Sequence, residues 1–199
     1  MKITFQIILS LCITYTNVFS QEALKLNSKA PNFEVISHNG ELLNLKELSK
    51  KGPVILTFYR GEWCPHCNLY MASLQDSLHL IEELNGTIIA ITPENFENID
   101  KTLAKSAAKF HVVYDRNHKI MDNYKVSYKM AMAKHAMYVT AGININKNSG
   151  NEDRMLPVPA TYIIDQNQKI IGAHFDEDYT QRMPIKDILS ILKQYHQKK

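Results

Sequence analysis

The sequence predicts an α/β fold in which helices flank a central mixed β-sheet. Two continuous runs of β-branched and aromatic residues, 54–59 and 87–92, are typical of strands buried on both faces. Each run is followed by apolar residues at helical spacing, so strands alternate with helices along the chain. A closing pair of strands, 161–165 and 169–172, precedes a last helix and completes a three-layer pattern.

The first half of the chain begins with a predicted hairpin. Residues 30–36 form a short strand, and the Asn-Gly of residues 38–40 is a typical hairpin turn. The central strand 54–59 leads through a cysteine-containing segment into an amphipathic helix that ends at Asn85-Gly86. The apolar positions that indicate this helix are Leu69, Ala72, Leu74, Leu78, Ile81 and Leu84.

The second half continues the alternation. Pro93 ends the strand 87–92, and residues 96–110 form a helix that buries Ile99, Leu103 and Ala107. The remaining predicted elements are a strand at 112–115, a helical turn at 120–124, strands at 161–165 and 169–172 joined by a turn at 166–168, and a last helix at 185–195.

Residues 127–156 interrupt this regular pattern. The stretch is rich in methionine early and in asparagine and glycine late. A lid, a partner surface and a loosely structured insertion are the three open interpretations. For Met130, Met132 and Met137 we favour filling of the core over a binding face.

Residues 1–20 have the pattern of an export signal. Lys2 supplies a positive start, residues 3–13 are largely apolar, and Val18-Phe19-Ser20 ends in small residues suited to cleavage after Ser20. The apolar run is too short for a comfortable membrane span, although an uncleaved anchor is the alternative. We therefore expect a single domain at residues 21–199, in the periplasm or secreted, without stable membrane insertion.

The charge balance argues against a nucleic-acid partner. The formal net charge is only +3, and the basic residues are scattered. A nucleic-acid binder would gather lysine and arginine in a patch or stripe. The length suits one domain with a proper core, which does not need a disulfide for folding.

The segment YRGEWCPHC, residues 59–67, holds the two cysteines that remain after the signal is removed. A lone Cys-x-x-Cys offers two metal ligands where structural zinc needs four, so we expect neither metal nor cofactor. A staple that closes so small a ring would constrain little of the unfolded chain. Cys64 and Cys67 are therefore predicted to be catalytic thiols, in peroxide reduction or in disulfide exchange.

The spacing assigns different roles to the two sulfurs. If the helix begins near Cys64, unpaired backbone N–H groups and the helix dipole stabilise its thiolate. Pro65 suits the first turn of a helix, because its missing N–H would have no partner there. Cys67 lies one turn further on and more deeply, which makes Cys64 the attacking thiol and Cys67 the resolving one.

A strand, a Cys-x-x-Cys and a following helix resemble the thioredoxin fold. Residues 158–161, Val-Pro-Ala-Thr, look like the segment of that fold in which a cis-proline, here Pro159, faces the cysteines. The resemblance is closer to the alkyl hydroperoxide reductase/thiol-specific antioxidant (AhpC/TSA) family, in its peroxiredoxin-like branch. The matching segments are 30–33, 58–67, 91–94, 112–116, 156–165 and 178–182.

This resemblance implies a thioredoxin-like fold and a thiol-dependent peroxide reductase, with an external dithiol as reductant. Two family positions differ. Thr57 and Gly61 stand where peroxiredoxins have a proline and a threonine or serine, and Pro159 stands where they have an arginine. Arg60 and Arg182 are the candidates to replace that arginine.

Three further residues of the segment have two readings each. His66 either stabilises the thiolate or faces solvent, and the Pro-His pair resembles that of strongly oxidising disulfide donors. Trp63 is expected to form a packing wall beside the sulfur rather than to donate a catalytic hydrogen bond. Glu62 is either a buried proton relay or, as we favour, an exposed carboxylate.

Three functions remain open. The first is an exported peroxide reductase, in which Cys64 attacks a hydroperoxide and Cys67 closes a disulfide. The second is a periplasmic thiol-disulfide oxidoreductase acting on protein disulfides, with Val158 and Pro159 presenting backbone to the client. The third is a redox-sensitive binding module that uses residues 127–156. The sequence leaves the oligomeric state open.

Overall fold

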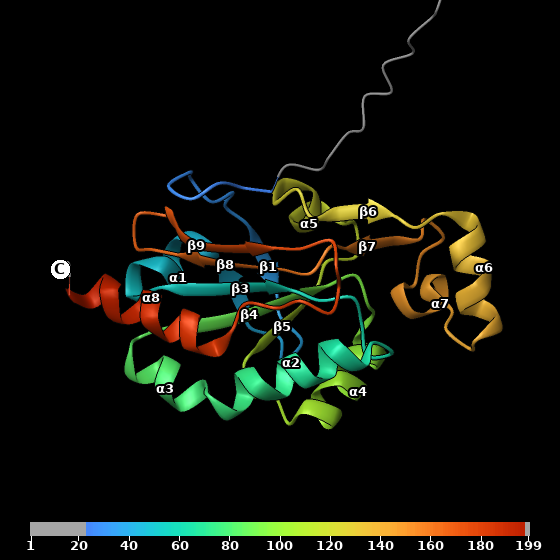
Figure 1. Cartoon of the computed structure of the whole chain (residues 1–199), viewed down its shortest axis with the longest axis horizontal. Coiled ribbons are helices and arrows are strands. Elements are labelled where there is room, and N and C mark those ends of the chain that lie inside the picture. Colours follow the sequence, from blue (N-terminus) through green and yellow to red (C-terminus); the bar gives the residue numbers. More distant parts are fainter. Residues whose placement is uncertain (1–22, 198–199) are drawn as a thin grey trace, which may run out of the picture.

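The computed structural model describes residues 23–197 and has the predicted α/β architecture (Figure 1). Its central sheet contains five strands in the order β5-β4-β3-β8-β9. The strands β3 (Val54–Phe58), β4 (Thr87–Thr92) and β5 (His111–Tyr114) are parallel. β8 (Ala160–Ile164) pairs antiparallel with β3, and β9 (Ile170–Phe175) pairs antiparallel with β8, so the sheet is mixed as predicted.

The two faces of the sheet pack against separate clusters. Successive residues of a strand point to opposite faces, and Val54 and Leu56 accordingly contact one cluster while Ile55 contacts the other. In β4, Ile89 and Ile91 likewise alternate with Ile88 and Ala90. These two strands, rich in β-branched residues on both faces, are thus buried on both sides, as the sequence indicated.

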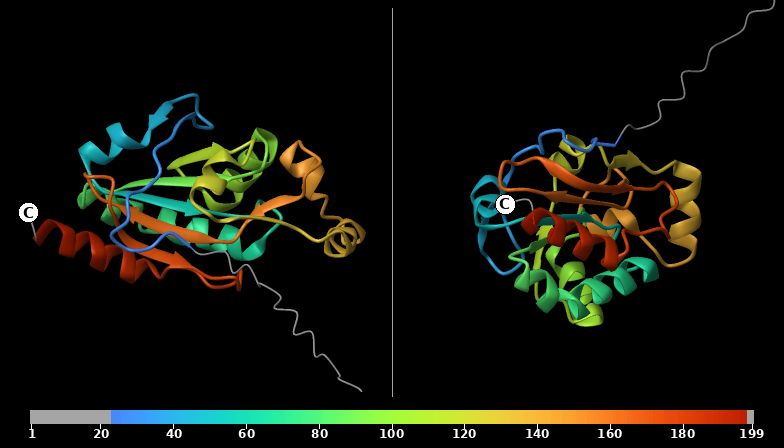
Figure 2. Two further views of the ribbon diagram at one scale, coloured as in Figure 1. Left: turned by 90° about the horizontal axis from the view of Figure 1, so that it is seen from above. Right: turned by 60° about the vertical axis from the view of Figure 1, so that its left-hand side comes forward.

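Different elements cover each face. The first face is covered by the hairpin β1 (Glu34–Ile36) and β2 (Leu42–Asn44), by α1 (Leu45–Lys51) and by α5 (Lys119–Asn123). The second face is covered by the helices α2 (Pro65–Asp76), α3 (Leu78–Glu83), α4 (Phe96–Ser106) and α8 (Ile185–Gln197), which Figure 2 shows from two sides. The reactive segment belongs to this second face.

Asparagine side chains cap the starts of three helices, among them α1 and α4. The Asn44 side chain accepts a hydrogen bond from the Glu47 N–H at 3.2 Å, and Asn95 accepts one from the Asn98 N–H at 3.2 Å. Each bond satisfies a backbone donor that has no partner inside the helix. These caps fix where α1 and α4 leave the loops before them.

Two helix predictions need correction. The single helix expected after the cysteines is divided at Ser77 into α2 and α3, and Leu69 is 68% exposed while Tyr70 and Met71 are buried. The helix expected at 96–110 ends at Ser106, because Ala107 takes a left-handed conformation with φ 53° and faces solvent. The other predicted inward positions are largely confirmed, since Leu74, Ile81 and Ile99 are buried, and Leu78, Leu84 and Leu103 pack against the cluster on the second face.

Residues 127–156 form a structured insertion rather than a loose one. The strands β6 (Ser127–Lys129) and β7 (Met155–Pro157) pair antiparallel, and α6 (Met132–Thr140) and α7 (Ile145–Ser149) lie between them in sequence. Figure 1 shows α6 and α7 beyond the end of the sheet at which α2 begins. The insertion therefore stands next to the cysteines.

The insertion has a small core of its own, formed by Met130, Ile145 and Leu156. Met130 is buried, which confirms its predicted place in a core. Met132 and Met137 are 72% and 71% exposed, so the core prediction is wrong for these two. A short helix that stands away from the sheet has no apolar surface to bury its outer face against.

The predicted export signal at residues 1–20 lies outside the described residues. Within residues 23–197, no helix has the length and apolar character needed to cross a membrane.

Candidate active site

Cys64 occupies the N-cap of α2, where the sequence predicted the start of the helix. Its backbone is extended, with φ −94° and ψ 106°, and Pro65 follows at the first helical position. The Cys64 carbonyl accepts hydrogen bonds from the Cys67 N–H at 3.0 Å and the Asn68 N–H at 3.2 Å. Both cysteines are free thiols, with Cys64 2% exposed and Cys67 fully buried.

The pKa values of the two thiols are shifted in opposite directions. A hydrogen bond from the Cys67 thiol, the backbone N–H of Cys67 and the charges of Arg60 and Arg182 together outweigh burial and lower the pKa of Cys64 to about 6. Burial and the bond to Cys64 raise the pKa of Cys67 well above its ordinary value. At neutral pH the pair therefore holds a Cys64 thiolate next to a protonated Cys67, as the proposed attacking and resolving roles require.

Arg60 is a buried cation beside this thiolate. It is 1% exposed, and its guanidinium lies 4.8 Å from the centre of the Trp63 ring and 4.3 Å from that of Tyr179. Its Nη2 donates a hydrogen bond to the Tyr138 hydroxyl at 2.9 Å. Among the described residues no carboxylate pairs with Arg60, so the nearby thiolate is the anion that its charge can stabilise.

Arg182 reaches the other cysteine. It lies between β9 and α8, and its Nη2 donates to the Cys67 sulfur at 3.4 Å. The guanidinium also lies 5.9 Å from the centre of the Tyr70 ring. The two arginines named from the sequence are thus both in the site, one against each sulfur.

Trp63 and His66 occupy different surroundings. Trp63 is half-buried and packs against both the second-face cluster and the insertion core, with its ring 5.6 Å from that of Tyr138. Trp63 therefore joins the packing of the second face to that of the insertion. His66 lies on the exposed first turn of α2, with its ring 5.8 Å from that of Tyr179.

Pro159 contributes to a cleft next to Arg60. The cleft has a volume of about 320 Å³, and its lining residues are Arg60, Tyr128, Lys134, Val158, Pro159, Glu177 and Tyr179. The peptide bonds of the described residues are all trans, which corrects the expected cis-proline. Residues before Pro159 already pair in β7, and the Val158 N–H donates to the Val126 carbonyl at 2.7 Å, so an extended chain runs directly into β8.

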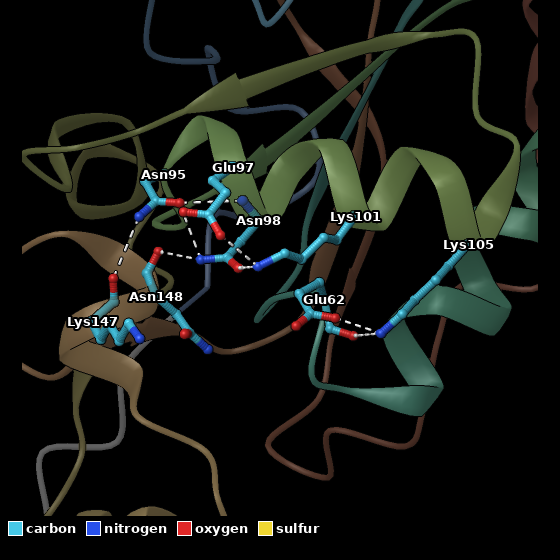
Figure 3. Close-up of polar contacts among 8 residues, drawn as sticks. All are labelled: Glu62, Asn95, Glu97, Asn98, Lys101, Lys105, Lys147 and Asn148. Atoms are coloured by element: carbon cyan, nitrogen blue, oxygen red, sulfur yellow. Dashed lines mark hydrogen bonds and ion pairs between the residues drawn. The ribbon is translucent and has the colours of Figure 1, made fainter.

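The buried carboxyl group of the site is Glu94, which the sequence reasoning missed. For Glu62, where an exposed carboxylate was favoured over a buried relay, the side chain is 18% exposed and forms an ion pair with Lys105 of α4 (Figure 3). Glu94 is 1% exposed, and its Oε2 accepts the Glu62 N–H at 2.7 Å. Burial is the main cause that raises the pKa of Glu94 to about 8, and the charge of Cys67 adds to it.

A signal for Glu94 was present in the sequence. It follows Pro93 directly after the buried strand β4, and β4 runs parallel to the strand that leads to the cysteines. The carboxyl ends of neighbouring parallel strands meet at one edge of a sheet, which is where sites form in such folds. A carboxylate at that position was therefore a candidate on topology alone.

Gly61 allows Glu94 to approach the reactive loop. Its φ of 149° is a conformation that side chains rarely adopt, and a Cβ there would lie 2.3 Å from Glu94 Oε1 and 2.6 Å from Trp63 Nε1. Only glycine fits this close contact without displacing the carboxyl group. The glycine that replaces the family's threonine thus has a packing reason.

Metal chemistry finds no support in the donor set. Across residues 23–197, no three His, Cys, Asp or Glu side chains are grouped so that they could hold a metal ion. The site consists of two thiols, two guanidinium groups, a buried carboxyl group and aromatic rings.

The chain is similar to known proteins whose names refer to thiol or peroxide chemistry. Residues 26–173 match the model of the AhpC/TSA family. The chain is 26% identical over 152 residues to "Thiol-disulfide oxidoreductase ResA" of Bacillus cereus, and this alignment covers 76% of the chain and 70% of the relative. The chain is 27% identical over 103 residues to "Peroxiredoxin Bcp" of Bacillus subtilis, and this alignment covers 52% of the chain and 65% of the relative.

Solved structures show the same fold. Peroxidoxin BcpB of Mycobacterium tuberculosis has a TM-score of 0.66 at 15% identity and covers 86% of this chain and 97% of its own. PrxQ of Xylella fastidiosa has a TM-score of 0.67 at 14% identity and covers 88% of this chain and 99% of its own. These similarities confirm the predicted thioredoxin-like fold.

Proposed function

Since the chain belongs to the AhpC/TSA family and is a thiol oxidoreductase of the thioredoxin fold, we propose that it reduces hydroperoxides through Cys64 and Cys67. The Cys64 thiolate attacks the terminal oxygen of ROOH, the O–O bond breaks, and the departing alkoxide takes a proton to become ROH. Cys64 becomes a sulfenic acid, so two electrons pass from sulfur to the peroxide.

The observation that carries this proposal is the thiolate of Cys64 beside the buried guanidinium of Arg60. A thiolate is the nucleophile, and a fixed cation stabilises the negative charge that develops on the peroxide oxygens. Arg60 is held between two aromatic rings and has no carboxylate partner among the described residues, so its charge is available to the reaction. It supplies the charge that peroxiredoxins obtain from the arginine missing at Pro159.

Cys67 completes the cycle. Its thiol attacks the Cys64 sulfenic acid, a Cys64–Cys67 disulfide forms and water leaves. An external dithiol then attacks Cys64, the disulfide breaks, and Cys67 leaves as a thiolate that Arg182 stabilises through its contact at 3.4 Å. The dithiol is oxidised to a disulfide and both cysteines return to the reduced state.

Glu94 is placed to handle the proton of Cys67. With a pKa of about 8 it is largely protonated at neutral pH and still able to exchange its proton, and its charge interacts with that of Cys67. In the minor carboxylate form Glu94 accepts the Cys67 proton and passes it to the departing hydroxide, which leaves as water, and in the acid form it protonates the Cys67 thiolate when the disulfide opens.

Thiol–disulfide exchange is the second candidate function. The cleft beside the site contains Val158 and Pro159 just before β8, where a client chain could be received. The alignments with ResA proteins also reach further than those with Bcp, to 85% of this chain in four cases. In that function Cys64 attacks a protein disulfide, or its own disulfide is attacked by a client thiol.

Export is part of the proposal. Residues 1–20 would be removed from a single domain of residues 21–199, which would act outside the cytoplasm. Sequencing the N-terminus of the protein isolated from its producing cells tests this, since Gln21 is expected as the first residue and Met1 would contradict it.

The two functions separate in a rapid-mixing experiment. Reduced protein is mixed with hydrogen peroxide while the fluorescence of Trp63, the only tryptophan, is followed, with Cys64→Ser as the control. A rate orders of magnitude above that of a free thiolate, absent in the control, supports peroxide reduction. A rate typical of any low-pKa thiol, together with rapid oxidation of a reduced client protein by the disulfide form, would favour disulfide exchange instead.

A further inference from the structure

Among the contacts that join the insertion to the body of the protein, two differ in how close they lie to the reactive site. At the first, α7 meets the start of α4: the Asn95 N–H and the Asn98 amide donate to the Asn148 carbonyl at 2.9 and 3.1 Å (Figure 3). The Asn95 amide also donates to the Lys147 carbonyl at 3.4 Å. These bonds join the backbone of the insertion to the start of α4, and none of them involves Arg60.

The second attachment is through α6 and differs in kind. No residue of α6 is buried, so little apolar packing fixes this helix. Its half-buried Tyr138 packs its ring against Trp63 at 5.6 Å and accepts the Arg60 hydrogen bond at 2.9 Å. Tyr138 thus joins α6 directly to the cation of the reactive site.

Arg60 depends on this contact for its orientation. A guanidinium has five N–H donors in a rigid plane, and the Nε of Arg60 is buried without a hydrogen-bond partner among the described residues. The Trp63 and Tyr179 rings hold the face of the group but leave it free to rotate in its plane. The Tyr138 hydroxyl supplies the directional bond that opposes this rotation.

We propose that Tyr138 is a positioning residue that holds the Arg60 guanidinium in the orientation that serves Cys64. The insertion at residues 127–156 is then a working part of the reactive site, because one of its helices sets the geometry of the charge there. The inference rests on the proposed role of Cys64 and Arg60, and it extends that role to an element outside the five-stranded sheet.

Tyr138→Phe tests the proposal by removing one hydroxyl while keeping the ring. A hydrogen bond to a charged group is strong enough that we expect the rate of Cys64 with hydrogen peroxide to fall about tenfold at pH 7. We also expect the pH midpoint of Cys64 alkylation by iodoacetamide to rise. Alkylation does not depend on the physiological substrate, so it reports on Arg60 positioning even if the protein proves to exchange disulfides.

Tyr114→Phe is the matched control. The Tyr114 hydroxyl donates to the Ser149 carbonyl at 2.5 Å, so this variant also removes one tyrosine hydrogen bond to the insertion, far from Arg60 in the contact network. We expect it to leave both readouts unchanged. If Tyr114→Phe moves them as much as Tyr138→Phe, the effect is a general loosening of the insertion and the proposal fails.

A double-mutant cycle gives the decisive comparison. In an Arg60→Lys background the planar group is gone, so Tyr138→Phe should have little further effect on either readout. An unchanged tenfold loss in that background would show that Tyr138 acts independently of Arg60 and would overturn the proposal. Unchanged peroxide and alkylation rates in the single Tyr138→Phe variant would overturn it as well.

Discussion

Cys67→Ala removes the interaction that contributes most to the low pKa of Cys64, the hydrogen bond from the Cys67 thiol. A pKa near 6 in place of the ordinary 9 corresponds to about 4 kcal/mol in favour of the thiolate. Hydrogen bonds to charged groups contribute about 1.5–3 kcal/mol each. We therefore expect the pKa of Cys64 to rise by about 1 to 2 pH units in this variant.

The assay is the rate of iodoacetamide alkylation of Cys64 against pH, followed by peptide mass spectrometry. Only the thiolate reacts, so the midpoint of the profile reports the pKa. Cys67→Ser is the matched comparison, because its hydroxyl still offers a donor to the Cys64 sulfur and should raise the midpoint less. A midpoint in Cys67→Ala equal to that of the wild type would refute the reasoning and assign the low pKa to the backbone N–H of residue 67 and the two arginines.

Three further predictions concern the surroundings of the pair. The pKa of Glu94 is raised to about 8 in the folded protein. Between about pH 4.5 and 8 the unfolded chain therefore loses this proton while the folded protein keeps it, and the free energy of unfolding falls as pH rises. Glu94→Gln should remove up to about 4 kcal/mol of that loss. Urea unfolding at pH 5 and pH 9 checks this, and an equal pH dependence in both proteins would contradict it. Gly61→Ala should lower the unfolding free energy by about 2 kcal/mol or more, because its Cβ meets Glu94 Oε1; an unchanged urea midpoint would argue against the clash. Arg182→Gln should slow reduction of the disulfide by dithiothreitol about three- to tenfold, because the leaving Cys67 thiolate loses its donor; stopped-flow rates equal to wild type would exclude that role.

The sheet was predictable because its signal is local. Apart from three threonines, residues 54–59 and 87–92 are apolar, and such β-branched and aromatic runs indicate strands buried on both faces. The start of α2 was equally plain, since Pro65 after Cys64 marks a first helical turn. These features depend on neighbours in sequence, not on tertiary contacts.

The errors arose where tertiary contacts decide. Leu69 has the spacing of an inner-face residue, yet it is 68% exposed while its neighbours Tyr70 and Met71 are buried. Ala107 was expected inside a helix that runs to residue 110, but α4 ends at Ser106. Amphipathic spacing indicates that a helix exists more reliably than it fixes which stripe faces the core.

The sequence was enough to find the two thiols of the site, but only some of the residues that surround them. Cys64, Cys67 and the two arginines lie in or near recognisable motifs, and the structure places all four together. Glu94 and Tyr138 reach the site from 30 residues or more further along the chain, through the ends of β4 and α6. No pattern around Tyr138 marks it, because its contact with Arg60 exists only once the insertion is folded.

The most direct test of the central claim is to find which sulfur is oxidised first. Reduced Cys67→Ser and Cys64→Ser variants are each treated with one equivalent of hydrogen peroxide in the presence of dimedone, which traps sulfenic acid, and are mapped by peptide mass spectrometry. We predict rapid labelling of Cys64 in the first variant and slow or no labelling of Cys67 in the second, with a Cys64–Cys67 disulfide in the wild type. Faster labelling of Cys67 than of Cys64 would contradict the assignment of the thiolate and of the two roles.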